Sequence, residues 1–336
     1  MTASAAPKVS RDIRVSVVIP ARNAASVLKA AVGSALADSA VDELIIAVGP
    51  STDATRAVAD ELAKNPRVEV VDNPDGTTPT GLNRAITAAR GDIIVRVDAQ
   101  SQLVDGYVTR AVETLERTGA ANVGGRQVPV ATTGFGRAVA AAMRSPAGSG
   151  GAAYRSADAP EGPVDTVYLG VFDRDALEAV GFFDETMLRN QDAELNARLR
   201  AHGYQVWFNP QLAVEYQPRQ SLRALASQYF QYGRWRRVTA RRYRSLRLRQ
   251  LAAPAIVAVL TTSIGVAVAT RNARIPALVG GSYLAAVTCA GAAAADDVRD
   301  APSAALALVT MHLAWGVGFL IGPPRSGVDK DSVGVR

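Results

Sequence analysis

The sequence predicts an α/β protein whose mainly parallel sheet carries helices on both faces and is followed by membrane-crossing helices. In the first hundred residues, short β-branched runs alternate with segments of helical spacing, as in βαβ units. Toward the C-terminus, eight arginines precede three long stretches without Asp, Glu, Lys or Arg, of which the third contains His312. With 336 residues and 48% hydrophobic content, the chain can bury a full core as one large domain or two.

The first three strand–helix pairs are visible in the spacing of apolar residues. A strand is expected between Arg14 and Asn23, broken by Pro20, and helical spacing follows from residue 24 to residue 37. The next two pairs are strand 43–48 with helix 55–63, and strand 67–71 with a helix at about 80–89. Turns rich in Gly, Pro, Asn and Asp separate them, and this alternation predicts parallel pairing of the strands.

The fourth strand, between Arg90 and Gln100, places a carboxylate at its own C-terminal end. Its β-branched run is Ile93, Ile94, Val95 and Val97. A short apolar run of this kind is typical of a parallel strand buried on both faces. Ligands of open α/β sheets bind outside the carboxyl ends of the strands, so Asp98 is expected at a ligand site. The alternative is that Asp98 is only a polar turn residue.

Several common kinds of site find no support in the sequence. No Gly-x-Gly-x-x-Gly follows a strand and no Gly-Lys-Ser/Thr loop is present, which disfavours dinucleotide binding and a Walker-type phosphate loop. The two histidines, His202 and His312, give little material for a histidine-based triad. The single cysteine, Cys289, excludes an intrachain disulfide, and Met1 to Arg14 hold no apolar run of a cleavable signal.

The positive charge is concentrated in residues 234–249, here called the arginine belt. Without its eight arginines the net charge of +6 would be −2, so the chain is not generally basic. The belt precedes the uncharged stretches 251–270, 275–295 and 301–324, each long enough to cross a hydrocarbon core about 30 Å thick. Arginines beside such stretches indicate a membrane surface and not a nucleic acid. Buried core helices are the alternative for the stretches.

The expected organisation has five parts. They are a disordered N-terminus (1–13), an α/β domain (14–230), a basic interfacial helix (231–250), about three transmembrane helices (251–324) and a tail (325–336). Three spans would place the α/β domain in the cytoplasm and the tail outside. Arg271 and Arg274 would then face outward, against the positive-inside tendency.

Six short blocks, in this order, resemble the successive motifs of family 2 glycosyltransferases. They are Val15 to Asn23, Ser51 to Thr55, Gly81 to Ile86 with Ala89 to Asp92, Val97 to Gln100, Asn190 to Leu195, and Gln231 to Trp235. The combination looks most similar to the membrane-linked, succinoglycan-biosynthesis branch, and it covers about residues 14 to 240. The resemblance implies a GT-A fold and sugar transfer from a nucleotide-diphosphate donor.

The resemblance also implies a divalent metal, Mg²⁺ or Mn²⁺, on the donor diphosphate. Such an ion prefers a few carboxylate oxygens plus substrate phosphates, and Asp98 fits that role. The family motif is usually Asp-x-Asp, often with a histidine third in this branch, whereas this chain has Gln100. An amide oxygen can coordinate a metal but brings no charge, so metal dependence is expected with Asp98 as its main ligand.

The resemblance assigns Asp192 as the general base that deprotonates an acceptor hydroxyl, which gives inversion at the anomeric carbon. Sequence shows neither the reach nor the pKa that a base needs. The alternative is an exposed acid at the start of a helix from Asp192 to His202, where a negative side chain is favourable. Glu194 is a weaker candidate for the same role.

The remaining site residues follow from the same blocks. The nucleotide side is expected to comprise Pro20, Asn23, Asp53, Asn83 and Arg84, with helix capping as the alternative for both asparagines. This chain has Val48 and Gly49 where the family commonly has two acids, which leaves the identity of the nucleotide open.

The acceptor side is expected at Gln231, Arg234 and Trp235. In the alternative, Trp235 with Tyr229 and Tyr232 anchors an interfacial helix at the headgroups. The Gly-, Ala- and Ser-rich segment 119–162 is expected to form a mobile loop over the acceptor site.

Together these features predict a membrane-anchored inverting glycosyltransferase with its catalytic domain in the cytoplasm. It would use a nucleotide-sugar donor and a lipid-linked or polysaccharide acceptor in cell-envelope or exopolysaccharide synthesis, and would not bind nucleic acid. A polyprenyl-phosphate sugar synthase is one alternative, since its acceptor phosphate needs no strong base. A non-catalytic membrane scaffold with a degenerate transferase fold is the other.

Overall fold

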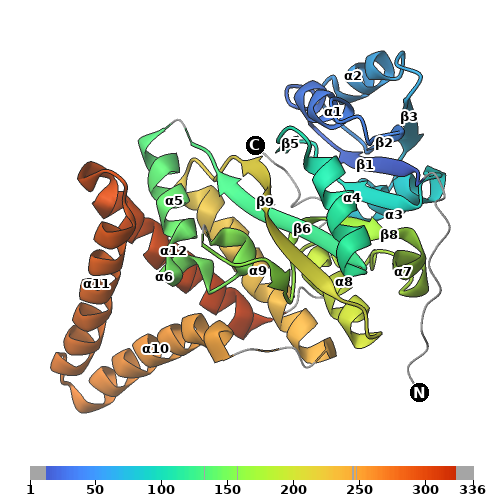
Figure 1. Ribbon diagram of the computed structural model, residues 1–336. Coiled ribbons are helices and arrows are strands. Elements are labelled where there is room, and N and C mark those ends of the chain that lie inside the picture. Colours follow the sequence, from blue (N-terminus) through green and yellow to red (C-terminus); the bar gives the residue numbers. More distant parts are fainter. Residues whose placement is uncertain (1–12, 132, 157, 244–245, 247, 323–336) are drawn as a thin grey trace, which may run out of the picture.

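A computed structural model describes residues 13–322 except 132, 157, 244–245 and 247. Its centre is one nine-stranded sheet in the order β3-β2-β1-β4-β8-β6-β9-β5, with β7 paired to β9 (Figure 1). The strands are β1 (Val15–Ala21), β2 (Glu43–Val48), β3 (Val68–Asp72), β4 (Ile93–Arg96), β5 (Gln102–Leu103), β6 (Asn122–Pro129), β7 (Gly162–Pro163), β8 (Tyr168–Asp173) and β9 (Val206–Tyr216). β1 to β4 are mutually parallel, whereas β8 runs antiparallel to both β4 and β6.

Helices cover both faces of the sheet, as predicted. The helices that precede β9 are α1 (Leu28–Leu36), α2 (Thr55–Leu62), α3 (Thr78–Ala88), α4 (Tyr107–Thr118), α5 (Gly134–Arg144), α6 (Pro146–Ser149), α7 (Arg174–Ala179) and α8 (Gln191–Ala201), with a 3-10 turn η1 (Ala153–Arg155). One hydrophobic cluster joins α1, α2 and α4 to one face, and a second joins α3, α7 and α8 to the other. Nearly every residue of β1 and β2 is buried, because helices cover the sheet on both faces.

The first four strands and three helices agree with the sequence-based prediction to within about two residues at most ends. Pro20 is an exception, because β1 continues through it to Ala21. Pro20 pairs with Ala47 of β2, while the pairing of β1 with β4 ends at Val18. A proline fits here because one side of β1 no longer needs a hydrogen-bond donor.

The prediction of a mobile loop at residues 119–162 is wrong. This segment contains the strand β6 at the middle of the sheet and the helix α5, most of whose residues are buried. Its glycines serve close packing: a Cβ on Gly125 would lie 1.6 Å from the Leu212 carbonyl oxygen, and one on Gly148 would lie 2.0 Å from that of Ala142. Small residues here reflect tight backbone contact and not mobility.

The C-terminal part consists of long helices: α9 (Leu222–Tyr243), a 3-10 turn η2 (Leu248–Leu251), α10 (Ala252–Thr270), α11 (Arg274–Ala294), a 3-10 turn η3 (Val298–Asp300) and α12 (Ala301–Ile321). Within the part of the chain that the structure describes, three segments are long and apolar enough to cross a membrane: Leu248–Thr270, Arg274–Ala294 and Val298–Ile321. The expected boundary between residues 230 and 231 falls inside α9, which is one continuous helix. The expected disordered N-terminus and the tail at 325–336 lie outside the described residues, except for Ile13.

A third hydrophobic cluster joins α5 and α9 to α11 and α12. It contains Val139, Met143, Tyr229, Leu308 and Met311 among others. Glycines bring α9 and α12 close together: a Cβ on Gly318 would lie 2.1 Å from the Phe230 carbonyl oxygen, and one on Gly233 would lie 2.0 Å from that of Trp315. The long α12 is therefore packed against α5 and α9, and Figure 1 shows it running beside them.

Candidate active site

The side chains of Asp98 and Asp192 meet at one arginine. Arg96 Nη2 and Nε donate to Asp98 Oδ1 at 2.8 and 3.2 Å, and Arg96 Nη1 donates to Asp192 Oδ1. The Arg96 side chain is 3% exposed, whereas those of Asp98 and Asp192 are 20% and 28% exposed. The two carboxylates that the sequence marked for different roles thus share one solvent-reachable site with a buried cation between them.

Both aspartates are held by the ends of secondary structure. Asp98 follows β4 at the carboxyl edge of the parallel strands, and Asp192 lies in the first turn of α8. Asn190, which precedes α8 in the left-handed conformation, donates from Nδ2 to the Tyr232 carbonyl oxygen at 3.1 Å. The N-terminus of α8 is therefore fixed to α9, and the start of a helix is a favourable place for the negative charge of Asp192.

Arg96 was not identified from the sequence. It lies in β4 between apolar neighbours, pairs in register with Gly170 of β8, and its guanidinium lies 5.7 Å from the centre of the Phe183 ring. A signal was available, because an arginine inside an otherwise apolar strand must find an acidic partner or cost several kcal/mol when buried.

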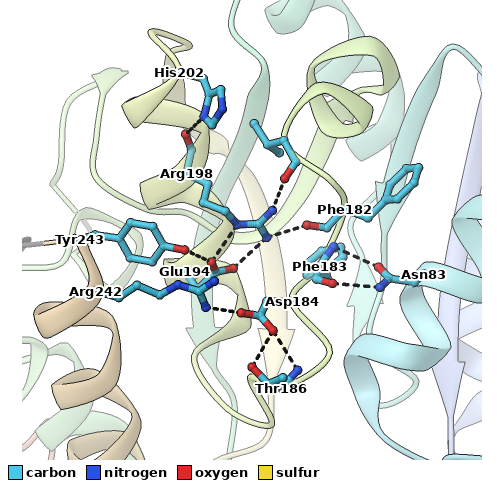
Figure 2. A network of polar contacts seen from close by, with 11 residues as sticks. Asn83, Phe182, Phe183, Asp184, Thr186, Glu194, Arg198, His202, Arg242 and Tyr243 are labelled. Carbon is cyan, nitrogen blue, oxygen red and sulfur yellow. Dashed lines mark hydrogen bonds and ion pairs between the residues drawn. The ribbon is translucent and has the colours of Figure 1, made fainter.

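Glu194, the weaker candidate for the base, is a structural residue. Its side chain is fully buried, and its oxygens accept from Arg198 Nε at 2.7 Å and Nη2 at 2.8 Å. Tyr243 Oη donates to the same carboxylate, as Figure 2 shows. With its oxygens occupied and no exposed surface, Glu194 cannot reach an acceptor hydroxyl.

The network in Figure 2 joins the loop before α8 to the end of α9. Arg198 donates to the carbonyl oxygens of Val180 and Phe182, and Arg242 pairs with Asp184. Burial alone would raise the pKa of Asp184, but hydrogen bonds from Thr186 and the Arg242 cation hold that pKa below its usual value. The segment that carries Asp192 is thus anchored on both sides.

Asn23 and Asp53 connect two loops at the carboxyl edge of β1 and β2. Asn23, in the left-handed conformation, accepts from the Thr52 backbone N–H at 2.8 Å. Asp53 accepts from the backbone N–H groups of Thr55 at 3.0 Å and Ala25 at 3.1 Å. Hydrogen bonds, first of all that from the Thr55 hydroxyl, lower the pKa of Asp53. Both side chains therefore order this edge of the sheet through caps and turns.

Asn83 and Arg84 lie on a different surface, around α3. Asn83 exchanges hydrogen bonds with the backbone of Phe183 at 2.9 and 3.0 Å, and its Nδ2 also donates to Glu185. Arg84 faces Asp75 at 3.5 Å. Both residues line an open depression of about 520 Å³ between β3, α3 and Glu185. Pro20, at the end of β1, packs close to the start of α3: a Cβ on Gly81 would lie 3.2 Å from the Pro20 Cβ. It therefore lies between the Asn23–Asp53 edge and the surface around α3.

Of the two residues expected to bind a divalent metal, Asp98 and Gln100, only Asp98 offers a carboxylate. Oδ1 of Asp98 is taken by Arg96, while its Oδ2 has no hydrogen bond or ion pair within the part of the chain that the structure describes. Gln100 is exposed in the turn after β4. No group of three or more His, Cys, Asp or Glu residues that could hold a metal occurs among the described residues. Any ion here would therefore need oxygens from a bound substrate.

The residues expected on the acceptor side lie where α9 meets α12. Trp235 is 8% exposed, Gln231 is half-buried, and Arg234 Nε donates to the Gly322 carbonyl oxygen at 3.0 Å. Arg234 also lies over the Phe230 ring at 5.5 Å. In this position Arg234 satisfies a carbonyl at the end of α12, a recognised role for arginine at a helix C-terminus.

A cluster of five tyrosines beside Asp98 was also not identified from the sequence. Its members are Tyr154, Tyr168, Tyr216, Tyr229 and Tyr232. Tyr168 stacks on Tyr154 with ring centres 6.5 Å apart, and Gln228 Nε2 donates to the hydroxyls of Tyr216 and Tyr232, at 3.0 Å each. The Arg155 guanidinium lies 5.4 Å from the centre of the Tyr154 ring. Burial, followed by the nearby Asp98 charge, raises the pKa of Tyr168, so its hydroxyl stays neutral.

Comparison with known proteins gives the chain its family. Residues 16–181 match the family model "Glycosyl transferase family 2". The chain is 35% identical over 312 residues to the succinoglycan biosynthesis protein ExoA of Rhizobium meliloti (strain 1021), covering 90% of this chain and 93% of that protein. A glucuronosyltransferase of Methanococcus voltae that acts on a dolichyl N-acetylglucosaminyl phosphate is 27% identical over 57% of this chain and 62% of its own length.

Among solved structures, a mannosyltransferase from Pyrobaculum calidifontis in complex with GDP-mannose and Mn²⁺ has a TM-score of 0.59 at 18% identity, covering 92% of this chain and 86% of that one. This likeness supports the GT-A fold that the sheet order and the helical layers already indicate. The match over nearly the whole of both chains in the succinoglycan protein is what decides the assignment. The protein belongs to glycosyltransferase family 2 and is a glycosyltransferase of polysaccharide-biosynthesis type.

Proposed function

We propose that Asp98, Arg96 and Asp192 form the reaction centre of an inverting transfer from a nucleotide-diphosphate sugar to a hydroxyl acceptor. The observation that carries this proposal is the shared arginine, which holds two partly exposed carboxylates at one end of the sheet. A single displacement needs the leaving group and the incoming hydroxyl on opposite sides of the anomeric carbon. Two carboxylates on separate elements, β4 and α8, provide one anchor for each side.

Asp192 acts as the general base. Its side chain is 28% exposed, so an acceptor hydroxyl can reach it, whereas the Glu194 side chain is fully buried. A base must reach the proton that it takes, and the Arg96 hydrogen bond engages Oδ1 of the Asp192 carboxylate. As Asp192 accepts the proton, the hydroxyl oxygen attacks the anomeric carbon and the bond to the diphosphate breaks.

Asp98 and Gln100 would hold a divalent ion together with oxygens of the donor diphosphate. One carboxylate plus substrate phosphates is a common donor set for Mg²⁺, and the Oδ2 atom of Asp98 is available for it. When bound, the ion supplies positive charge against the charge that develops on the leaving diphosphate. The solved mannosyltransferase that contains GDP-mannose and Mn²⁺ supports the use of a divalent ion, without saying which residues hold it.

The acceptor is lipid-linked or a growing polysaccharide, and it approaches over the tyrosine cluster. Tyrosine rings offer flat apolar faces to sugars together with hydroxyl groups for hydrogen bonds. The nucleotide lies at the edge that Pro20, Asn23 and Asp53 order, with Asn83 and Arg84 at its margin. Names of two relatives support this acceptor class, since one acts in succinoglycan synthesis and the other on a dolichyl-linked sugar.

The protein is anchored in a cell membrane. Its catalytic half, which comprises the elements from β1 to α9, lies in the cytoplasm, where nucleotide sugars are made. Three long apolar helices and the adjoining arginine belt support the membrane location. The single cysteine, Cys289, is consistent with a reducing compartment for the catalytic half.

The donor assignment is tested by thermal unfolding of the purified protein with a panel of nucleotide diphosphates and nucleotide sugars, with Mn²⁺ or with a chelator. A ligand that binds only the folded protein raises its unfolding temperature. We expect one nucleotide to stabilise the wild type in a Mn²⁺-dependent way and Asp98→Asn to lose that dependence. Asp60→Asn, at a surface pair of α2, is the control and should respond like the wild type. A Mn²⁺ response that survives Asp98→Asn contradicts the assignment.

A further inference from the structure

We propose that α12 lies along the membrane surface and that only α10 and α11 cross the bilayer, as a hairpin. Length and composition alone allow three crossings, because all three helices qualify. The contacts of α12 separate it from the other two. The proposal concerns how the molecule sits on lipid, and it does not depend on which sugar the enzyme transfers.

The catalytic half holds α12 at both ends and in the middle. At the start, Arg137 of α5 pairs with Asp300 through Nε at 3.0 Å and Nη2 at 3.4 Å. In the middle, Nε2 of His312 lies 3.0 Å from the carbonyl oxygen of Ala147 in α6. At the end, Arg234 Nε donates to the Gly322 carbonyl oxygen at 3.0 Å, and Arg237 donates to that of Phe319 at the same distance.

These partners belong to the enzyme's own fold. α9, whose Phe230 and Gly233 contact α12, is tied to the active-site segment through Asn190 and through the Arg242–Asp184 pair. The 21 residues of α12 make a helix about 31 Å long, which equals the thickness of a hydrocarbon core. An upright α12 would therefore carry α5 and α9 into the hydrocarbon along its whole length.

The middle of α12 faces a polar part of the enzyme, which disfavours that position. Tyr229 of α9 belongs to the same hydrophobic cluster as Met311 of α12, and Arg155 Nη1 donates to the Tyr229 hydroxyl at 3.4 Å. An upright α12 would bring this arginine near the centre of the bilayer, where each arginine costs roughly 2.5 to 3.5 kcal/mol even on the lenient insertion scale. Lying flat, α12 keeps Arg155 out of the hydrocarbon and leaves Arg137 and Arg144 at headgroup level, where they attract anionic lipids.

α10 and α11 differ in both contacts and exposure. α10 touches α12 near its own start, where Gly316 packs on the Ala253 carbonyl. α11 touches α12 along its second half, from Tyr283, whose hydroxyl lies 3.2 Å from His312 Nδ1, to Gly291, which packs on Ala305. Beyond these contacts they run away from α12 and meet at residues 271–273, a corner that Figure 1 shows far from α12. Large apolar side chains stand exposed along both helices: Val259, Ile264, Val268, Leu278 and Leu284. These surfaces need lipid, and an even number of crossings returns the chain to the side of the catalytic half.

Site-directed labelling tests this topology, because the chain contains a single cysteine to remove. In a Cys289→Ser background, cysteines are placed at Asn272 between α10 and α11, at Arg299 before α12, and at Ser332 in the C-terminal segment. Glu116→Cys, exposed on α4, marks the side of the catalytic half. The full-length protein is expressed in cells, and right-side-out vesicles are treated with a membrane-impermeant maleimide before and after permeabilisation.

We expect only the cysteine at 272 to react in sealed vesicles, and those at 116, 299 and 332 to react after permeabilisation. Labelling at 332 in sealed vesicles while 116 stays protected means three crossings and overturns the proposal. Protection of 272 together with 116 means that the hairpin does not cross, which overturns it as well. Neither result bears on the donor assignment, which the Mn²⁺ experiment tests independently.

Discussion

At the residue scale, Arg96 decides whether two acidic side chains can share one site. It is nearly inaccessible and is the only cation that the structure places against both Asp98 and Asp192 among the described residues. Two carboxylates that meet without a cation repel each other, and one of them tends to take up a proton. The guanidinium donates to the two carboxylates from different nitrogens, whereas a lysine would have to serve both from one ammonium nitrogen.

Arg96→Gln should therefore lower both stability and activity. Loss of the cation leaves Asp98 and Asp192 without their partner, and removing one member of a buried pair costs about 3 kcal/mol. Chemical denaturation in detergent measures this loss, and a sugar-transfer assay should show at least a tenfold drop in rate. The stability and the transfer rate of Arg96→Lys should lie between those of the wild type and of Arg96→Gln.

Arg56→Gln is the matched control for that experiment. Arg56 also bridges two aspartates, Asp60 and Asp72, but all three side chains are more than half exposed, so little change is expected. Equal behaviour of the Arg96 and Arg56 variants would mean that the bridge at the active site is incidental.

Asp38 is a second buried acid whose role can be measured by pH. It accepts from the backbone N–H groups of Val108 at 2.8 Å and Thr109 at 3.1 Å, which begin α4, and from that of Ala40 at 3.1 Å. Burial alone would raise its pKa, but these hydrogen bonds and that from the Thr109 hydroxyl hold the pKa below the ordinary value of 3.8. The carboxylate is thus a cap for α4 supplied from a distant part of the chain.

Asp38→Ala should destabilise the protein by about 2 kcal/mol near neutral pH, because it leaves buried N–H groups unpaired. Since the folded-state pKa is lowered, the contribution of the carboxylate is fully present above the unfolded pKa and is lost as pH falls through the folded value. The difference in unfolding free energy between variant and wild type should therefore shrink below about pH 4. A difference that stays constant down to pH 3 would refute the ionised cap.

At the scale of elements, the contact of α9 with α12 joins the catalytic half to the three long apolar helices. It depends on the absence of side chains at Gly233 and Gly318, where an added Cβ would lie within 2.1 Å of a facing carbonyl oxygen. Close approach of helices through small residues is the usual way in which membrane-associated helices pack. The same α9 holds the start of α8 through Asn190, so its displacement would reach Asp192.

Gly318→Ala should destabilise the protein by about 1 to 3 kcal/mol, since the added methyl forces α9 and α12 apart. Gly265→Ala in α10 is the control: no atom lies within 4 Å of its added Cβ, and helix propensity alone favours alanine. Thermal unfolding in detergent compares the two variants. If Gly318→Ala were as stable as Gly265→Ala, the two helices would not be in the close contact described here.

At the scale of the whole molecule, the parts that follow from local pattern were predictable and the parts that depend on long-range packing were not. Strand–helix alternation gave β1 to β4 with α1 to α3, and it placed Asp98 just after β4, at the carboxyl edge of the parallel strands. Asp192 came from family resemblance, because nothing in the local sequence brings residue 192 beside residue 98. Arg96 was passed over, since a strand pattern does not say which acid a buried cation will meet.

The errors have physical causes too. Residues 119–162 are rich in glycine and alanine, and the same residues serve flexible loops and tight packing; only the partner, here Leu212 in β9, distinguishes them. The boundary at residue 230 followed the onset of positive charge, whereas α9 is defined by backbone hydrogen bonds that charge does not interrupt. The number of apolar stretches was predicted, but hydropathy alone does not say which of them meets protein and which meets lipid.

The most direct measurement is the rate of sugar transfer by Asp192→Asn, compared with its binding of the donor. The amide keeps the shape of the side chain but cannot accept the proton of an acceptor hydroxyl. The account predicts that transfer falls by about 10²- to 10⁴-fold while the Mn²⁺-dependent thermal response to the nucleotide sugar persists. Transfer at close to the wild-type rate would contradict it, and would point to an acceptor, such as a phosphate, that needs no base.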